Sequence, residues 1–74
     1  MSGLYAVILV DSTSHALRIE KLLAQCSLAC KLVPVPRHLS SDCGVCVRIE
    51  RSDAETVRAL LAAHGVEFQA IEDT

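Results

Sequence analysis

The 74-residue chain has almost no aromatic side chains: Tyr5 and Phe68 are the only two, and tryptophan is absent. It also has no basic tract, and its 7 lysines and arginines are outnumbered by 9 acidic residues, which gives a net charge of −2. Dedicated nucleic-acid binders use clustered cations and aromatic surfaces on which bases stack. The composition therefore predicts no nucleic-acid partner.

Long hydrophobic runs are absent as well. The longest is Leu4–Val10, seven residues, whereas a helix that spans a bilayer needs roughly 20 apolar residues. The first residues, Met-Ser-Gly, are not followed by the basic region and long apolar segment of a signal peptide. We therefore expect no membrane partner and a cytoplasmic location, where thiols are reduced at rest.

Proline and glycine are scarce, with two and three residues, and no linker divides the chain. A chain of this length is one small domain, residues 1–74. Hydrophobic residues make up 51% of it, so leucine, valine, isoleucine and alanine must build the core. Domains this small often gain stability from a metal, a disulfide or a partner subunit.

The first half of the chain predicts a strand, a helix and a second strand. The β-branched run Leu4–Val10 is typical of a strand that is buried on both faces. Ser12, Thr13 and Ser14 are capable N-caps for a helix over about 14–26. A strand over 28–35 should lie at a sheet edge, or end at Pro34, because proline cannot donate a ladder hydrogen bond.

The second half predicts a strand, a helix and a final strand. Residues 45–50 alternate, with Val45, Val47 and Ile49 on one face and Cys46, Arg48 and Glu50 on the other. Residues 52–55 read as a capping box for a helix, and Gly65 suits the left-handed position after it. Residues 66–71 read as the last strand and 72–74 as a frayed end.

The order β-α-β-β-α-β predicts an α+β ferredoxin-like sandwich, an antiparallel four-stranded sheet with two helices on one face. The first and third strands would be central, and the second and fourth would be edges. In this arrangement the connections 11–15, 36–44 and 64–65 share one end of the sheet. Cys43 should then approach the start of the first helix, in the company of Arg37 and all three histidines, His15, His38 and His64.

This placement bears on chemistry because helix N-termini and nearby cations favour the reactive thiolate. Gly44, next to Cys43, leaves room for close backbone approach or an unusual backbone angle. The alternative is that residues 40–44 are simply a solvated hairpin loop. His64 equally suits a helix C-terminus, and His15 a surface position.

The four cysteines allow two further interpretations. Cys43-Gly-Val-Cys46 is a C-x-x-C, yet Cα atoms three residues apart in an extended strand are about 10 Å apart, beyond the roughly 7 Å limit for a disulfide. Cys26, Cys30, Cys43 and Cys46 also imitate a zinc spacing, but the topology puts the two pairs at opposite ends. We expect no metal site, and we interpret Cys26 and Cys30 as small buried hydrophobic residues.

Two segments carry a family resemblance. They are Pro36-Arg-His-Leu-Ser-Ser-Asp-Cys-Gly44 and, before it, Ser12-Thr-Ser-His-Ala-Leu-Arg-Ile-Glu-Lys-Leu-Leu23. With them, roughly residues 5 to 70 resemble a family of small bacterial proteins described as selenium/sulfur carrier protein-like. The resemblance implies that Cys43 would hold a persulfide or perselenide. The chain departs from the family at Ser27, where glycine is frequent, and at Cys46, where an apolar residue is more usual.

Together these observations favour a sulfur or selenium carrier that takes its cargo from a cysteine desulfurase or another chalcogen donor. Arg37 and the helix start at Ser12 and Thr13 would stabilise negative charge at Cys43. Ser40, Ser41, Asp42 and Gly44 would shape the loop, although the carboxylate of Asp42 would raise a neighbouring thiol pKa. We expect no cofactor, and a carrier or binding protein rather than a turnover enzyme.

Two alternatives stay open. The first is a non-catalytic interaction or regulatory module, because small folds of this kind serve many functions. Alternate residues of 4–10, with Cys46, would form an apolar patch on the sheet face without helices, which predicts a homo-oligomer or partner contact there. The second is a dithiol redox protein in which Cys46 is a second active thiol.

Overall fold

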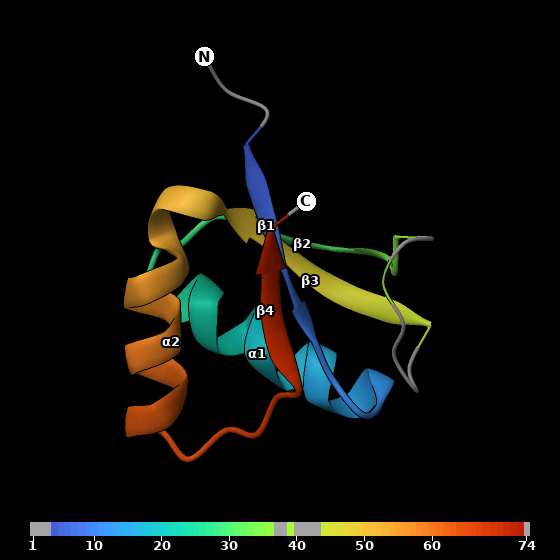
Figure 1. The fold of residues 1–74 in the computed structure, drawn as a ribbon. Helices are drawn as coiled ribbons and strands as arrows, with labels where there is room; N and C mark the ends of the chain where they lie inside the picture. Colours follow the sequence, from blue (N-terminus) through green and yellow to red (C-terminus); the bar gives the residue numbers. More distant parts are fainter. Residues whose placement is uncertain (1–3, 37–38, 40–43, 74) are drawn as a thin grey trace.

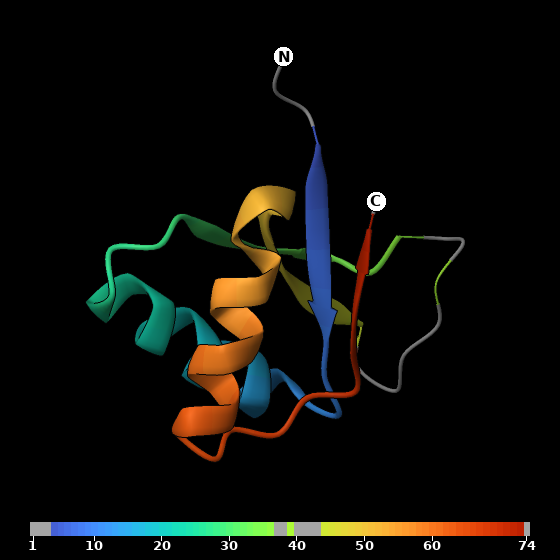
Figure 2. The ribbon, with the colours of Figure 1, turned by 60° about the vertical axis from the view of Figure 1, so that its left-hand side comes forward.

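The chain folds into one antiparallel sheet with both helices on the same face (Figures 1 and 2). This is a computed structural model, and it describes residues 4–36, 39 and 44–73. The elements are β1 (Tyr5–Leu9), α1 (Thr13–Gln25), β2 (Cys30–Pro34), β3 (Val45–Glu50), a 3-10 turn (Arg51–Asp53), α2 (Ala54–Ala63) and β4 (Ala70–Asp73). The strand order is β2-β3-β1-β4, with every neighbouring pair antiparallel. The predicted α+β ferredoxin-like sandwich is confirmed, including its central strands β1 and β3.

The main core lies between the sheet and the helices. Strand periodicity turns Ala6 and Ile8 of β1, and Val10 just after it, toward the helical layer, where all three are fully buried. They pack with inward-facing residues of the other elements: Ala16, Ile19, Leu23, Val47, Ile49, Val57, Leu61 and Val66. Each fully buried valine, leucine or isoleucine contributes about 1.5–3 kcal/mol, so this layer holds the helices against the sheet.

Both helices end in the same type of cap. Ser27 follows α1 with φ 60°, and Gly65 follows α2 with φ 65°. The next residue then bonds back into the helix: Leu28 N–H donates to the Leu23 carbonyl, and Val66 N–H to the Leu61 carbonyl, both at 2.9 Å. This is the Schellman motif, which needs a left-handed residue at its centre. The predicted role of Gly65 is confirmed.

Two predictions about the second half of the chain are wrong. Residues 66–69 are not strand, because the backbone N–H of Val66 bonds to the helix end and that of Gln69 to the Leu9 carbonyl. Pairing with β1 therefore starts at Ala70 and continues to Asp73, in the part predicted to fray. The capping box is also absent: Asp53 is the N-cap of α2, makes no side-chain cap bond, and ends the preceding 3-10 turn.

The helix-free face of the sheet, the face opposite the helices, is not the exposed apolar patch that the sequence predicted. Val7, Leu9 and Cys46 form a second cluster there, with relative exposures of 1%, 5% and 0%. Four partly buried residues pack against this cluster: Val33, Val35, Leu39 and Ala70. The expectation that the first strand is buried on both faces is thus confirmed for β1 from Ala6 onward, while the predicted exposed patch is wrong.

No helix within the described ranges combines the length and apolarity that crossing a membrane requires.

Candidate functional site

The predicted site centres on the connection between β2 and β3, and the structure describes the ends of this connection. Pro36, Leu39 and Gly44 are described. Six residues that the sequence singled out lie outside the described residues: Arg37, His38, Ser40, Ser41, Asp42 and Cys43. What can be described of the site is therefore the two ends of this connection and the elements that lie beside them.

A short ladder closes the base of the connection. Pro34 pairs with Val45, and the Val35 N–H donates to the Gly44 carbonyl at 3.2 Å. Farther out, the Leu39 N–H donates to the Pro36 carbonyl at 3.0 Å, and the Leu39 side chain packs on the second cluster. The connection thus leaves the sheet at a fixed point and is anchored once more on the helix-free face.

Neither the backbone angle nor the space around it requires glycine at position 44. Its φ lies outside the left-handed region, and a Cβ placed on it would meet no atom within 4 Å. The unusual backbone angle considered from the sequence is therefore wrong for the described conformation. Gly44 is exposed, and a small side chain there has open space.

The start of α1 lies at the same end of the sheet as Gly44. Ile8 pairs with Val47, and in an antiparallel pair each step forward on one strand is a step back on the other. Continuing this register by three residues brings Asp11 opposite Gly44. Figure 1 agrees, since the first turn of α1 and the beginning of β3 lie on the same side of the molecule. The predicted proximity of the helix start and the end of the connection is thus supported.

Ser12 caps this helix. Its Oγ accepts the His15 backbone N–H at 3.4 Å and lies 2.8 Å from His15 Nδ1, so the hydroxyl is committed to the cap. Thr13 is the first residue of α1 and is exposed. The first turn of α1 holds no acidic residue, although the carboxylate of Asp11 directly precedes the cap.

Gln69 also lies at the end of the sheet where α1 starts, and sequence reasoning did not identify it. Its side-chain Nε2 donates to Asp11 Oδ1 at 2.6 Å, and its backbone N–H donates to the Leu9 carbonyl at 2.7 Å. These bonds fasten the segment before β4 to the turn between β1 and α1. A lone glutamine in a segment that alternates like a strand carries no sequence signal for this role.

Cys46 is buried with its side chain on the helix-free face, and its thiol donates to the Pro34 carbonyl at 3.8 Å. A thiol exchanges only if it can be reached and can ionise. Burial in an apolar cluster therefore argues for a packing role rather than for a second active thiol.

The other two described cysteines lie away from the start of α1. Cys26 is exposed as the C-cap of α1, so its interpretation as a buried hydrophobic residue is wrong: the position lies past the buried helix stripe. Cys30 is half-buried, and burial, with a smaller contribution from the Glu20 carboxylate, raises the pKa of its thiol. Within the described ranges no group of three or more histidine, cysteine and acidic side chains could hold a metal.

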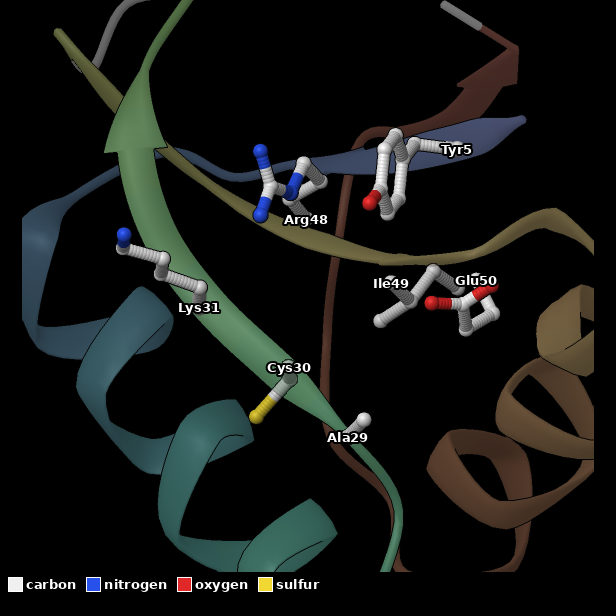
Figure 3. Close-up of a pocket in the computed structure, with 7 residues that line it drawn as sticks. All are labelled: Tyr5, Ala29, Cys30, Lys31, Arg48, Ile49 and Glu50. Atoms are coloured by element: carbon white, nitrogen blue, oxygen red, sulfur yellow. The ribbon is translucent and has the colours of Figure 1, made fainter. Parts of the chain in front are cut away.

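A hollow of about 240 Å³ opens at the other end of the sheet, lined in part by Tyr5, Lys31, Arg48 and Glu50. The Arg48 guanidinium carbon lies 4.3 Å from the centroid of the Tyr5 ring. Figure 3 shows the Cys30 sulfur turned toward α1 and away from both cations. The lining residues of β3 lie four to six positions from Gly44, roughly 13–20 Å along the strand, so this hollow is not part of the predicted site.

His64 does not lie beside the first turn of α1. It lines a second hollow with the later part of that helix, including Lys21 and Gln25. The predicted grouping of all three histidines at one point is therefore wrong for His64, because α2 ends against the later turns of α1. His15 remains at the helix start through its contact with Ser12.

Comparison with protein families decides the relationship of the chain. A family model described as "Putative Se/S carrier protein-like" matches residues 5–72. The chain belongs to this family. The match runs from β1 into β4, so it includes both the capped start of α1 and the β2–β3 connection. Searches of curated proteins and of solved structures found no significant match.

Proposed function

We propose that this member of the Se/S carrier-like family carries sulfur or selenium as a persulfide or perselenide on Cys43. The observation that supports the proposal is that the start of α1, whose first turn has no acidic residue, and Gly44 lie at the same end of the sheet. A helix N-terminus favours a thiolate and the negatively charged persulfide alike. Cys30 and Cys46 lack such surroundings, since one is partly and the other fully buried.

The transfer is a thiol exchange without net oxidation. The Cys43 thiolate attacks the terminal sulfur of a persulfide on a donor enzyme, such as a cysteine desulfurase. The bond between that sulfur and the donor cysteine breaks, the new bond to Cys43 forms, and the donor leaves as a thiolate. Delivery to an acceptor repeats the step in the other direction, so the carrier needs no cofactor.

The neighbouring residues have distinct roles in this proposal. Arg37 and the N–H groups at the start of α1, shaped by Ser12 and Thr13, stabilise the negative sulfur. Ser40, Ser41 and Gly44 shape the loop and leave the thiol open to a protein partner. The carboxylate of Asp42 opposes the ionisation of a nearby thiol, which limits reaction with small oxidants.

Mass spectrometry after incubation with a cysteine desulfurase and cysteine tests the proposal. We expect the reduced protein to gain one sulfur atom and Cys43→Ala to gain none. Cys26→Ala is the matched control, because it removes an exposed thiol at the other end of α1 and should gain sulfur like the unchanged protein. Absence of added sulfur, or equal addition to Cys43→Ala, would contradict the proposal.

The location and the assembly belong to the same proposal. A carrier that depends on reduced thiols suits the cytoplasm, and its principal partner is the donor enzyme. The homo-oligomer expected through the helix-free face stays a prediction. Burial of Val7, Leu9 and Cys46 within a single chain removes the apolar patch on which it rested. Sedimentation at high protein concentration measures it directly.

A further inference from the structure

The second hollow lies between the later turns of α1 and the end of α2, and both helices lie on the helical face of the sheet (Figures 1 and 2). It encloses about 200 Å³. Half-buried Leu22 and buried Val66 give it an apolar part, and the exposed side chains of Arg18, Lys21, Gln25 and His64 surround that part. The proposed carrier chemistry uses none of these residues.

The charge of this hollow is of one sign. None of the described residues that line it is acidic, and Arg18 and Lys21 make no ion pair within the part of the chain that the structure describes. Their own helix offers no compensation either. The side chains three and four positions away from these two cations include no aspartate or glutamate.

This arrangement is unfavourable unless something else compensates it. Two like charges three positions apart on a helix repel each other, and no acidic side chain among the described lining residues offsets this repulsion. A bound anion would remove the repulsion. The hollow is smaller than the roughly 300–1,000 Å³ of a typical cofactor or drug site, so the anion must be small.

We propose that the hollow between α1 and α2 binds a small oxyanion, with a phosphate group as its best-fitting ligand. The arginine fork donates two parallel hydrogen bonds to phosphate oxygens, and the lysine supplies a point charge. The Gln25 amide and the His64 imidazole add further donors. This site is independent of Cys43, and its failure would leave the carrier proposal unaffected.

An NMR titration of the labelled protein with inorganic phosphate, at constant pH and ionic strength, tests the proposal. We expect saturable shifts of the backbone amides of residues 18–25 and 64–66. Arg18→Gln and Lys21→Gln should each weaken binding by about tenfold, the usual effect of losing a charged hydrogen bond. The spectra of these exposed-site variants also report whether the fold is intact.

Arg58→Gln is the matched control, because Arg58 is an exposed cation on α2 that does not line the hollow. It changes the net charge equally and should leave the affinity within about twofold. A parallel titration with glycerol 3-phosphate distinguishes the source of the ligand: equal affinity indicates a free anion, and tighter binding a phosphomonoester. Shifts that do not saturate, or equal weakening by Arg58→Gln and Arg18→Gln, would overturn the site.

Discussion

At the scale of single residues, Ser27 occupies a conformation that suits another amino acid. Its φ of 60° places Cβ against the following carbonyl, which costs a non-glycine residue about 1–2 kcal/mol. Gly65 makes the same cap on α2 without that cost. The cap after α1 is kept because the Leu28 N–H bond and the packing of Leu28 against the main core depend on it.

Ser27→Gly should stabilise the protein by about 0.5–1 kcal/mol. Removing Cβ relieves the left-handed strain, while the greater freedom of glycine in the unfolded chain offsets part of the gain. Urea unfolding followed by circular dichroism measures the difference. Gly65→Ala is the reciprocal variant and should destabilise by about 1 kcal/mol through φ alone, since its new Cβ would meet no atom within 4 Å. A loss of stability in Ser27→Gly would contradict this account.

Cys30 should behave as a protected thiol. Burial, assisted by Glu20, raises its pKa above the ordinary value of 9.0, so at pH 8 it should react with iodoacetamide more slowly than cysteine in a short peptide. The unfolded chain loses this proton first, so the contribution to stability is present below about pH 9 and falls as the pH rises further. Across pH 7.5–10.5, alkylation rates measure the reactivity of Cys30, and urea midpoints measure the change in stability.

Glu20→Gln isolates the smaller cause of this protection. The variant should alkylate somewhat faster at Cys30 than the unchanged protein, while burial keeps the rate below that of the peptide. Glu67→Gln changes the net charge equally at an exposed position and should leave the rate unchanged. Peptide-like reactivity of Cys30 in the folded protein would refute the interpretation.

At the scale of elements, the β2–β3 connection is fixed at its two ends and also at Leu39 between them. Leu39 packs on the second cluster, beside the buried thiol of Cys46. When a loop opens locally from a sheet, the residues beneath it become reactive only in the open state, whose population falls exponentially as the free energy of opening rises. The reactivity of Cys46 is therefore a measure of how firmly the connection is anchored.

Leu39→Ala should make Cys46 react about tenfold faster with a thiol reagent and should cost about 1–2 kcal/mol of stability. The cost is below the 2–5 kcal/mol of a fully buried leucine because Leu39 is only partly buried. Leu17→Ala makes the same chemical change at a side chain that is 50% exposed and should alter neither quantity by much. Mass-resolved alkylation measures the rate, and equal protection of Cys46 in both variants would exclude the anchoring role.

At the scale of the whole molecule, the sequence predicted what depends on periodicity. The alternation in 45–50 and the stripe of α1 led to the correct sheet order and main core. The prediction of secondary structure failed where hydrogen bonds between distant segments determine the backbone conformation. Val66 and Gln69 look like strand residues, yet their N–H groups bond to α2 and to Leu9. The exposure of the helix-free face was mispredicted for a related reason. No sequence pattern indicates that Leu39, in the β2–β3 connection, packs on the cluster of Val7, Leu9 and Cys46.

The two outer strands have a consequence for solution behaviour. Unpaired strand edges are templates for edge-to-edge aggregation, and natural sheets protect them with proline and charge. Here β2 ends at Pro34 and carries Lys31, while β4 is short and includes Glu72 and Asp73. A protein that is half hydrophobic by composition is therefore protected against edge-to-edge aggregation at high concentration, which the proposed carrier role would require.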